Sequence, residues 1–179
     1  MNVVQNLHTA WELIKSDWSV YPYKPKVQIS DGILMIICAL TAKTQSFAYL
    51  FWFRLASVSN PFRLIAKIMH YRLSRSYGVY IPVTTKIGKG FHIWHPCGIV
   101  INPDAIIGDY CQIHQFLSIG NTVYGVATIG NHVFIGPHVS IVGPVRIGDN
   151  AKIGAGTTVI KNVPTGCTTV GVGNRIVER

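Results

Sequence analysis

A six-residue repeat of aliphatic side chains constrains the fold of this chain more than any other feature. From residue 129 a branched aliphatic residue recurs at every sixth position, and four of these are followed by glycine: Ile129, Ile135, Ile141, Ile147, Ile153 and Val159. Such a period fits short strands joined by sharp bends into a three-sided coil, with one aliphatic side chain per face pointing at the axis. A second inward set of mostly small or branched residues follows four positions later: Val133, Val139, Val145, Ala151, Thr157 and Val163. The spacing therefore predicts a parallel β-solenoid.

The repeat also runs backwards from residue 129, with two interruptions. It continues through Ile119, Ile113, Ile107, Ile101, Ile93, Ile87 and Ile81. Extra residues occur at 96–100 and at 120–128, and such insertions leave a coil as loops, where repeat proteins often bind their ligands. Thirteen hexads at three per turn predict about four turns, with strands about 4.8 Å apart.

The composition limits the classes of function. The chain has 179 residues, of which 49% are hydrophobic and 13% charged, which is typical of a globular or membrane-associated protein and not of a disordered one. Its net charge is +9, and residues 1–80 hold nine of the sixteen Lys and Arg. No helix-turn-helix, zinc-finger or aromatic-basic RNA pattern accompanies this charge, so a nucleic-acid partner is not expected. The four cysteines form no CxxC pair, which favours a reducing, cytoplasmic compartment.

Residues 1–80 are expected to form an N-terminal helical region, before a coil domain over 81–179. Helices are predicted from Ser30, with Asp31 in the first turn, to about Ser76, with a break at Asn60-Pro61. Cations lie among aromatic residues there, a mixture that allows packing on the coil or a partner subunit, which we favour, or peripheral contact with the inner face of a membrane. No signal peptide is evident, and the longest apolar run has eight residues, whereas spanning a bilayer takes about 20.

The segment 93–100 departs from the repeat in a way that indicates chemistry. Trp94 replaces the usual glycine, His95 follows, and the turn is lengthened. Counting three hexads per turn stacks Ile93, Ile113, Ile135 and Ile153 on one face, so one edge of the coil carries His95, Gln115, Pro137 and Ala155. An imidazole titrates near neutral pH and can act as a general base toward a hydroxyl. His92 could pair with His95 on a metal, but no third ligand has suitable spacing, so no metal is expected.

Several segments resemble one family, the hexapeptide-repeat acyltransferases. The segment 95–103, HPCGIVINP, is similar to the histidine-to-GIV turn of serine O-acetyltransferases and of their relatives in capsule and exopolysaccharide clusters. Residues 115–120 (QFLSIG), 153–159 (IGAGTTV) and 171–177 (GVGNRIV) resemble further elements of that family, in the same order. The resemblance covers residues 80–177, just over half of the chain. It implies a left-handed β-helix, an acetyl-CoA-dependent O-acetyltransferase and a homotrimer whose active-site groove lies between subunits.

The resemblance and the positions of residues in the coil together suggest roles for individual residues. His95 would be the general base. The pantetheine groove would hold small or polar residues: Gly120, Asn121, Gly136, Pro137, Gly154 and Ala155. Candidates for the CoA phosphates are the cations near the end of the coil, Lys152, Lys161 and Arg175. Candidates for the acceptor side are Tyr80, Trp94, Asp104, His114 and Gln115.

Departures from the serine enzymes bear on the acceptor. Trp94 and Tyr80 stand where those enzymes have aspartates, and the loop 120–128 is shorter than theirs and lacks their second histidine. A serine ammonium needs a carboxylate, whereas a hydroxyl-rich acceptor does not, and Trp94 would suit stacking on a sugar. We therefore expect a glycan or nucleotide-sugar acceptor in capsule, exopolysaccharide or lipopolysaccharide synthesis. The alternatives are serine O-acetylation in cysteine biosynthesis and a non-catalytic trimeric scaffold.

Overall fold

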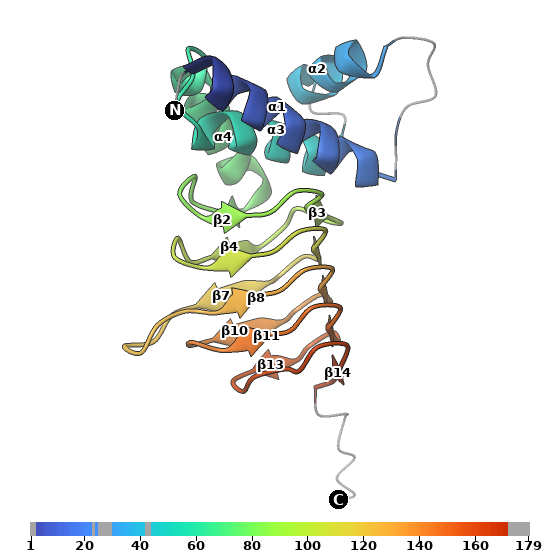
Figure 1. Cartoon of the computed structure of the whole chain (residues 1–179), viewed down its shortest axis with the longest axis vertical. Coiled ribbons are helices and arrows are strands. Elements are labelled where there is room, and N and C mark those ends of the chain that lie inside the picture. The colour runs from blue at the N-terminus through green and yellow to red at the C-terminus, as the bar shows by residue number, and fades with distance from the viewer. Residues whose placement is uncertain (1–2, 23, 25–29, 42–43, 172–179) are drawn as a thin grey trace, which may run out of the picture.

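The chain folds as a three-sided coil of short strands with helices packed on its first turn (Figure 1). The computed structural model describes residues 3–22, 24, 30–41 and 44–171. The helices are α1 (Val3–Val20), α2 (Asp31–Thr41), α3 (Gln45–Ser57) and α4 (Arg63–Tyr77). The helices predicted from Ser30 to about Ser76 are thereby confirmed, with Gly78 in the left-handed conformation at the end of α4.

All strands of the coil pair in parallel, in three sheets. The first sheet holds β1 (Val79–Tyr80), β4 (Ile99–Ile101), β7 (Ser118–Gly120), β10 (Ser140–Val142) and β13 (Thr158–Val159). The second holds β2 (Lys86–Ile87), β5 (Ile106–Ile107), β8 (Thr128–Ile129) and β11 (Arg146–Ile147). The third holds β3 (His92–Ile93), β6 (Gln112–Ile113), β9 (Phe134–Ile135), β12 (Lys152–Ile153) and β14 (Thr168–Thr169). We call them sheets A, B and C.

The predicted register is confirmed, but the predicted number of turns is too low. Ile93, Ile113, Ile135 and Ile153 are direct partners along sheet C. The coil has close to five turns rather than about four. The difference arises because β14, which extends the coil at its C-terminal end, lies outside the aliphatic repeat, with Thr169 beside Ile153.

Both inward sets of side chains fill the interior as the spacing predicts. Every isoleucine of the repeat from Ile93 to Ile153 is buried, and so is the second set from Val133 to Val163. The corner after sheet C has positive φ at Gly98, Phe116, His138 and Gly156, and the rings of Phe116 and His138 stack with centroids 4.6 Å apart. A side chain at Gly98 would collide with Phe116. Only glycine satisfies both the φ of +62° and this close approach.

The insertion at residues 120–128 leaves the coil between β7 and β8, as predicted, and projects sideways from it (Figure 1). Its tip is a narrow turn in which Thr122 and Gly125 exchange backbone hydrogen bonds. Val123 is 94% exposed there and Tyr124 84%. Within a single chain, no other described segment packs on the tip of this loop.

The aromatic residues of α3 form the centre of the helical cap. Phe47, Tyr49, Phe51, Trp52 and Phe53 are all buried, and the Trp52 indole N–H donates to the carbonyl of Ala39 at 3.1 Å. Packing is thus the role of these side chains. Among the described helices none is by itself long and apolar enough to cross a membrane, although α2 and α3, bent at 99°, pass that test together by length and composition.

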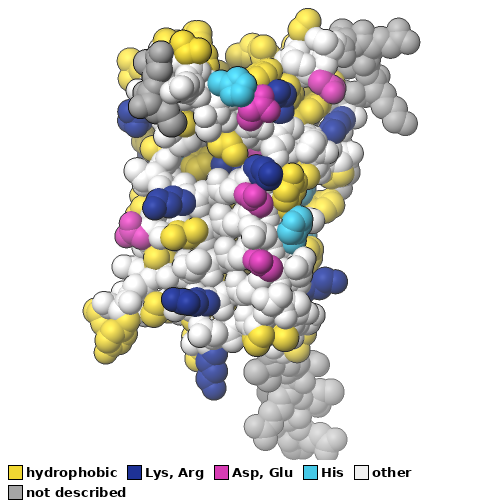
Figure 2. All heavy atoms as spheres, viewed as in Figure 1, with side chains coloured by type: hydrophobic (Ala, Val, Ile, Leu, Met, Phe, Trp, Pro, Cys, Tyr) yellow, Lys and Arg dark blue, Asp and Glu magenta, His cyan; other side chains and the backbone are white. Residues whose placement is uncertain are grey.

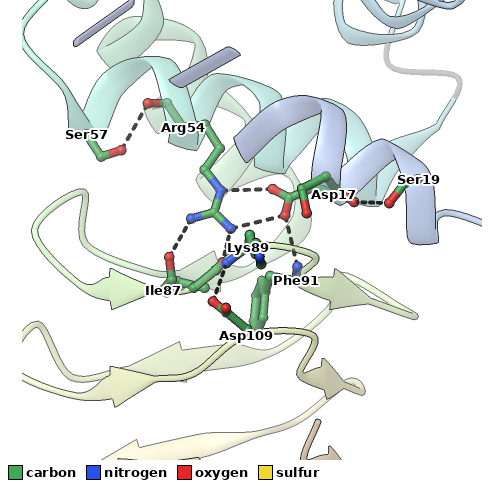
Figure 3. A network of polar contacts seen from close by, with 10 residues as sticks. Asp17, Ser19, Arg54, Ser57, Ile87, Lys89, Phe91 and Asp109 are labelled. Atoms are coloured by element: carbon green, nitrogen blue, oxygen red, sulfur yellow. Dashed lines mark hydrogen bonds and ion pairs between the residues drawn. The ribbon is translucent and has the colours of Figure 1, made fainter. Parts of the chain in front are cut away.

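A buried ion pair joins the cap to the coil (Figure 3). Arg54 of α3 donates to both carboxylate oxygens of Asp17 in α1, at 2.8 and 3.1 Å, and to the carbonyls of Ile87 and Gly88 in the first turn of the coil. The Phe91 N–H donates to Asp17 at 2.9 Å. Burial raises the pKa of Asp17, and Arg54 opposes that rise. The pair fixes two helices to the coil at one point.

Two buried histidines are held uncharged by their surroundings. In α4, His70 shares a 2.9 Å hydrogen bond with the Tyr49 hydroxyl, and burial lowers the pKa of His70 to about 4. Burial likewise lowers the pKa of His92 in β3 to about 4, with smaller contributions from His114 and His95. Each must lose its environment before it can take a proton near neutral pH.

These low pKa values predict a loss of stability in acid. Between the unfolded pKa of about 6.5 and the folded pKa of about 4, the unfolded chain binds more protons than the folded chain. The free energy of unfolding therefore keeps its full value above pH 6.5 and decreases as the pH falls toward 4. His92→Leu should remove about 1–3 kcal/mol of that loss. The measurement is the urea midpoint at pH 7 and pH 4.5. The exposed His8→Leu should behave as wild type, and an equal acid loss in His92→Leu would show that His92 does not contribute.

Candidate active site

His95 projects from the corner that joins sheet C to sheet A. β3 ends at Ile93 and β4 begins at Ile99, and between them the Cys97 N–H donates to the His95 carbonyl at 2.9 Å. The Phe116 N–H of the next turn donates to the Cys97 carbonyl at 2.9 Å. The His95 side chain is exposed. The corner backbone is thus fixed by its own turn and by its neighbour, while the ring faces outward.

No side chain among the described residues orients the His95 ring by a hydrogen bond. Tyr80, a candidate for the acceptor side that stands where the serine enzymes have an aspartate, lies in sheet A beside Val100. It lines an apolar cavity of about 570 Å³ together with His70 and Tyr71 of α4. Within one chain, Tyr80 and His95 therefore belong to different surroundings.

The edge below His95 carries the column that the sequence predicted. Gln115, Pro137 and Ala155 follow in successive turns. The backbone N–H groups of Gln115 and Ala155 donate to no other described residue, whereas Pro137 accepts from the Gly156 N–H at 2.9 Å. The Oε1 atom of Gln115 is buried without a partner among the described residues. Buried polar atoms are normally satisfied, so the Gln115 side chain lacks an expected partner, and the two backbone N–H groups are free to donate to a ligand.

A row of rings runs beside this edge on the outer face of sheet C. Trp94 stacks on His114 with centroids 5.8 Å apart, and His114 meets the edge of Phe134 at 5.0 Å. The Trp94 indole N–H donates to Gln112 at 3.1 Å. Nδ1 of His114 lies 2.9 Å from the carbonyl of Ile135. A carbonyl can only accept, so Nδ1 donates in this bond and Nε2 points away from it.

His92 completes this row, although the sequence suggests for it only a metal-ligand role beside His95, which the lack of a suitably spaced third ligand rules out. It is buried against Trp94, with centroids 4.8 Å apart, and its Nε2 has no partner among the described residues. The repeat could have placed His92 on the outer face of sheet C, because the residue before each sheet C isoleucine points outward, as Gln112, Phe134 and Lys152 do. In the described part of the chain no three His, Cys, Asp or Glu residues are grouped as a metal site.

The other predicted site residues lie in two places, one near the His95 edge and one at a different corner of the coil. Gly136 and Gly154 follow the sheet C isoleucines, near the His95 edge, and Lys152 is exposed on sheet C. The corner between sheets A and B instead carries Asp104, Gly120, Asn121 and Lys161. These four residues are not brought to His95 within one chain. Arg175 lies outside the described residues.

Two more carboxylates belong to the third corner, between sheets B and C. Asp109 accepts from the Lys89 N–H at 3.0 Å, and Asp149 accepts from the Asn131 N–H at 2.6 Å. Both carboxylates therefore serve the backbone of the coil. Asp104 is exposed. Its backbone N–H donates to Asn102 Oδ1 at 3.0 Å within a turn, and its carboxylate makes no hydrogen bond to another described residue.

A repeated parallel coil with an exposed histidine at a lengthened corner defines the class of hexapeptide transferases. Residues 127–161 match the family described as bacterial transferase hexapeptide (six repeats). A serine acetyltransferase from Synechococcus elongatus is 39% identical over 57% of this chain and 43% of its own length. Serine acetyltransferases from two Helicobacter pylori strains are 34% and 31% identical, over 67% and 71% of their lengths. The chain belongs to the serine acetyltransferase family.

Solved structures agree with the fold over nearly the whole chain. Serine acetyltransferase isoform 3 from Entamoeba histolytica, in complex with cysteine, superposes with a TM-score of 0.75 at 23% identity, over 99% of this chain and 64% of that one. The enzyme from Neisseria gonorrhoeae, in complex with serine, gives 0.67 at 28% identity over 94% and 70%. The left-handed β-helix with N-terminal helices is thereby confirmed. The chain spans 43% of the Synechococcus relative's length.

The expected glycan or nucleotide-sugar acceptor, and the assignment to the capsule and exopolysaccharide branch, are wrong. The relatives and the solved structures are serine acetyltransferases. The argument from Trp94 fails physically as well, because the indole is half-buried and one of its faces is stacked on His114. Its presence beside His95 is explained by packing within the row of rings.

Proposed function

We propose that this protein transfers the acetyl group of acetyl-CoA to the hydroxyl of L-serine, which gives O-acetyl-L-serine and CoA. The observation that carries the proposal is the exposed His95 imidazole at the head of an edge with unused hydrogen-bonding groups. Membership of the serine acetyltransferase family supports the choice of acceptor.

In this proposal His95 moves one proton twice. A ring nitrogen takes the proton of the serine hydroxyl as the oxygen attacks the thioester carbonyl carbon. The C–S bond then breaks, and the imidazolium returns the proton to the departing thiolate. The backbone N–H of Gln115 is a candidate donor to the oxyanion, because it is unpaired in the neighbouring turn.

The residues of the His95 edge suit the pantetheine arm of acetyl-CoA, which carries amide donors and acceptors. The backbone N–H groups of Gln115 and Ala155 can donate to amide carbonyls, and Gln115 Oε1, which is buried without a partner among the described residues, could accept from an amide N–H after a rotation of its side chain. Three turns of about 4.8 Å separate His95 from Ala155, so the arm would run roughly 14 Å along the edge. Gly136 and Gly154 add no side chain that would obstruct it, and Lys152 is exposed nearby for the phosphates. Acetyl-CoA supplies the activated acyl group.

We further propose that a neighbouring subunit of a homotrimer completes the acceptor site. The ammonium group of serine requires a carboxylate when it leaves water. Asp109 and Asp149 bind the backbone of their own coil, whereas Asp104 is exposed at the corner between sheets A and B. In a threefold assembly, different corners of adjacent coils can flank one groove. Asp104 of one subunit would then face His95 of another, with Gly120, Asn121 and Lys161 on the same side.

Substitution of Asp104 tests this arrangement. Asp104→Asn should raise the KM for serine about 10–100-fold, because it removes a charged hydrogen bond of about 1.5–3 kcal/mol, and should leave the KM for acetyl-CoA nearly unchanged. Release of the CoA thiol, followed while each substrate is varied, gives both constants. Asp149→Asn, at the third corner, is the matched control and should alter neither. An unchanged serine KM in Asp104→Asn would place the ammonium group elsewhere, and no serine-dependent thiol release in wild type would favour the scaffold alternative.

A further inference from the structure

We propose that the exposed face of helix α4 binds the surface of an anionic membrane. Its apolar residues are Phe62 at the N-cap and Leu64, Ile65, Ile68 and Tyr71 in the helix, and its cations are Arg63, Lys67, Arg72 and Arg75. All nine side chains are exposed, and Leu64, at 71%, is the most exposed of the apolar ones. We call these nine residues the α4 face.

The spacing of these residues produces an apolar stripe with cations on both flanks. Leu64, Ile68 and Tyr71 are four and three residues apart, so they lie one above another along the helix. At 3.6 residues per turn, Lys67 lies on one flank of this stripe and Arg72 on the other. The opposite side of α4 is buried on the cap through Ala66, His70 and Leu73.

The polar tips of the α4 face are also arranged as at a membrane interface. The Arg75 guanidinium lies over the Tyr71 ring at 5.7 Å and donates to its hydroxyl at 3.1 Å. Tyrosine and arginine at the border of an apolar stripe are typical of interfacial helices, because one end of each side chain is apolar and the other is hydrated.

The charge around the α4 face identifies the partner. The sequence has no Asp or Glu from residue 32 to residue 103, while the same stretch contains eight Lys and Arg. A basic amphipathic helix is attracted to anionic headgroups, at about 1 kcal/mol per cation near the surface, while its apolar residues enter the boundary with the acyl chains. The α4 face has both components.

The same charge pattern argues against a two-fold contact between the α4 faces of two copies of this chain. A two-fold contact would bring the α4 face onto itself. Each group of four cations would then meet its copy with no carboxylate of residues 32–103 between them. Juxtaposed like charges oppose such a contact.

Helix α2 supplies a second apolar face on the same cap. Ile33, Ile36, Ile37 and Leu40 are exposed, and Leu34, Met35, Cys38 and Ala39 are buried against the cap. Figure 2 shows hydrophobic side chains gathered over the end of the cap that points away from the coil. A homotrimer with parallel coils would present three such caps at one end, and their membrane affinities would reinforce one another.

Co-sedimentation of the full chain with vesicles tests the proposal. We expect binding to vesicles of 70% phosphatidylcholine and 30% phosphatidylglycerol at about 0.1 M salt, and at least tenfold weaker binding to pure phosphatidylcholine or at about 0.5 M salt. Lys67→Gln with Arg72→Gln should weaken binding about 30-fold, and Ile68→Ser should weaken it in the absence of any charge change. Lys86→Gln with Arg146→Gln removes two exposed cations from sheet B and is the matched control.

Three outcomes would overturn the proposal. These are no binding to anionic vesicles, equal binding to neutral ones, or an equal loss in the sheet B variant. A lower assembly mass for Ile68→Ser in lipid-free analytical ultracentrifugation would instead identify the α4 face as a contact between copies. Neither acetyl-CoA nor serine is present in these experiments, so their result is independent of the acetyl transfer proposed above.

Discussion

Substitution of His95 by alanine is expected to lower kcat/KM for acetyl transfer to serine by about 10²–10⁴, the usual contribution of a general base. The loss should fall on kcat, because the proton is moved in the transition state, while the KM for acetyl-CoA changes little. The exposed ring makes no hydrogen bond with another described residue, so its removal should leave the unfolding midpoint and the assembly mass unchanged. Steady-state thiol release and analytical ultracentrifugation measure the two effects.

A second coil histidine provides the control for His95. His132 is exposed at the corner between sheets B and C, where its φ of 55° is tolerated by asparagine. His132→Asn should retain wild-type kinetics. If His95→Ala retains full activity, another group is the base, and the first candidate is then His114, whose Nε2 is left free by the bond from Nδ1 to Ile135.

The largest expected effect on stability comes from the ion pair between cap and coil. Asp17→Asn should lower the free energy of unfolding by about 3–5 kcal/mol, because Arg54 would be left buried without its countercharge. In a chain of this length that corresponds to a melting temperature lower by roughly 6–20 °C. Differential scanning calorimetry at fixed protein concentration measures it, since association also shifts the melting temperature.

The same helix supplies a matched control for this prediction. Glu12→Gln makes the same acid-to-amide change in the exposed pair with Lys15 and should leave the melting temperature unchanged. Asp17→Leu combined with Arg54→Met should recover much of the stability lost in Asp17→Asn, because no unpaired charge remains. A melting temperature of Asp17→Asn equal to that of wild type would show that the pair does not hold the cap to the coil.

The coil could be predicted from sequence because its geometry depends on one spacing. An inward side chain at every sixth residue determines which isoleucines stack, and the stacking of Ile93 on Ile113 and Ile135 was predictable without coordinates. The last strand, β14, was missed because Thr169 stands where the repeat would place an isoleucine. The pair of Asp17 and Arg54 was also beyond prediction, since 37 residues separate the two and no local pattern links them.

Part of the candidate site was also predictable, because it depends on the same six-residue spacing as the coil. His95 was marked by the break in the repeat, and its edge followed from the register. The environment of Trp94 did not follow, because its packing against His92 and His114 depends on side-chain orientations across turns. The sequence alone therefore suggests an exposed Trp94 and a sugar acceptor, and the prediction of that acceptor is wrong.

The central claim, that His95 heads an edge at which serine is acetylated, is tested most directly by identifying the product. The full chain is incubated with L-serine and acetyl-CoA labelled with ¹³C in the acetyl group, and the amino-acid fraction is analysed by mass spectrometry. We predict labelled O-acetylserine, formed in proportion to the CoA released and reduced at least 100-fold in His95→Ala. Consumption of labelled acetyl-CoA without formation of labelled O-acetylserine would contradict the account. So would an equal amount of this product from His95→Ala.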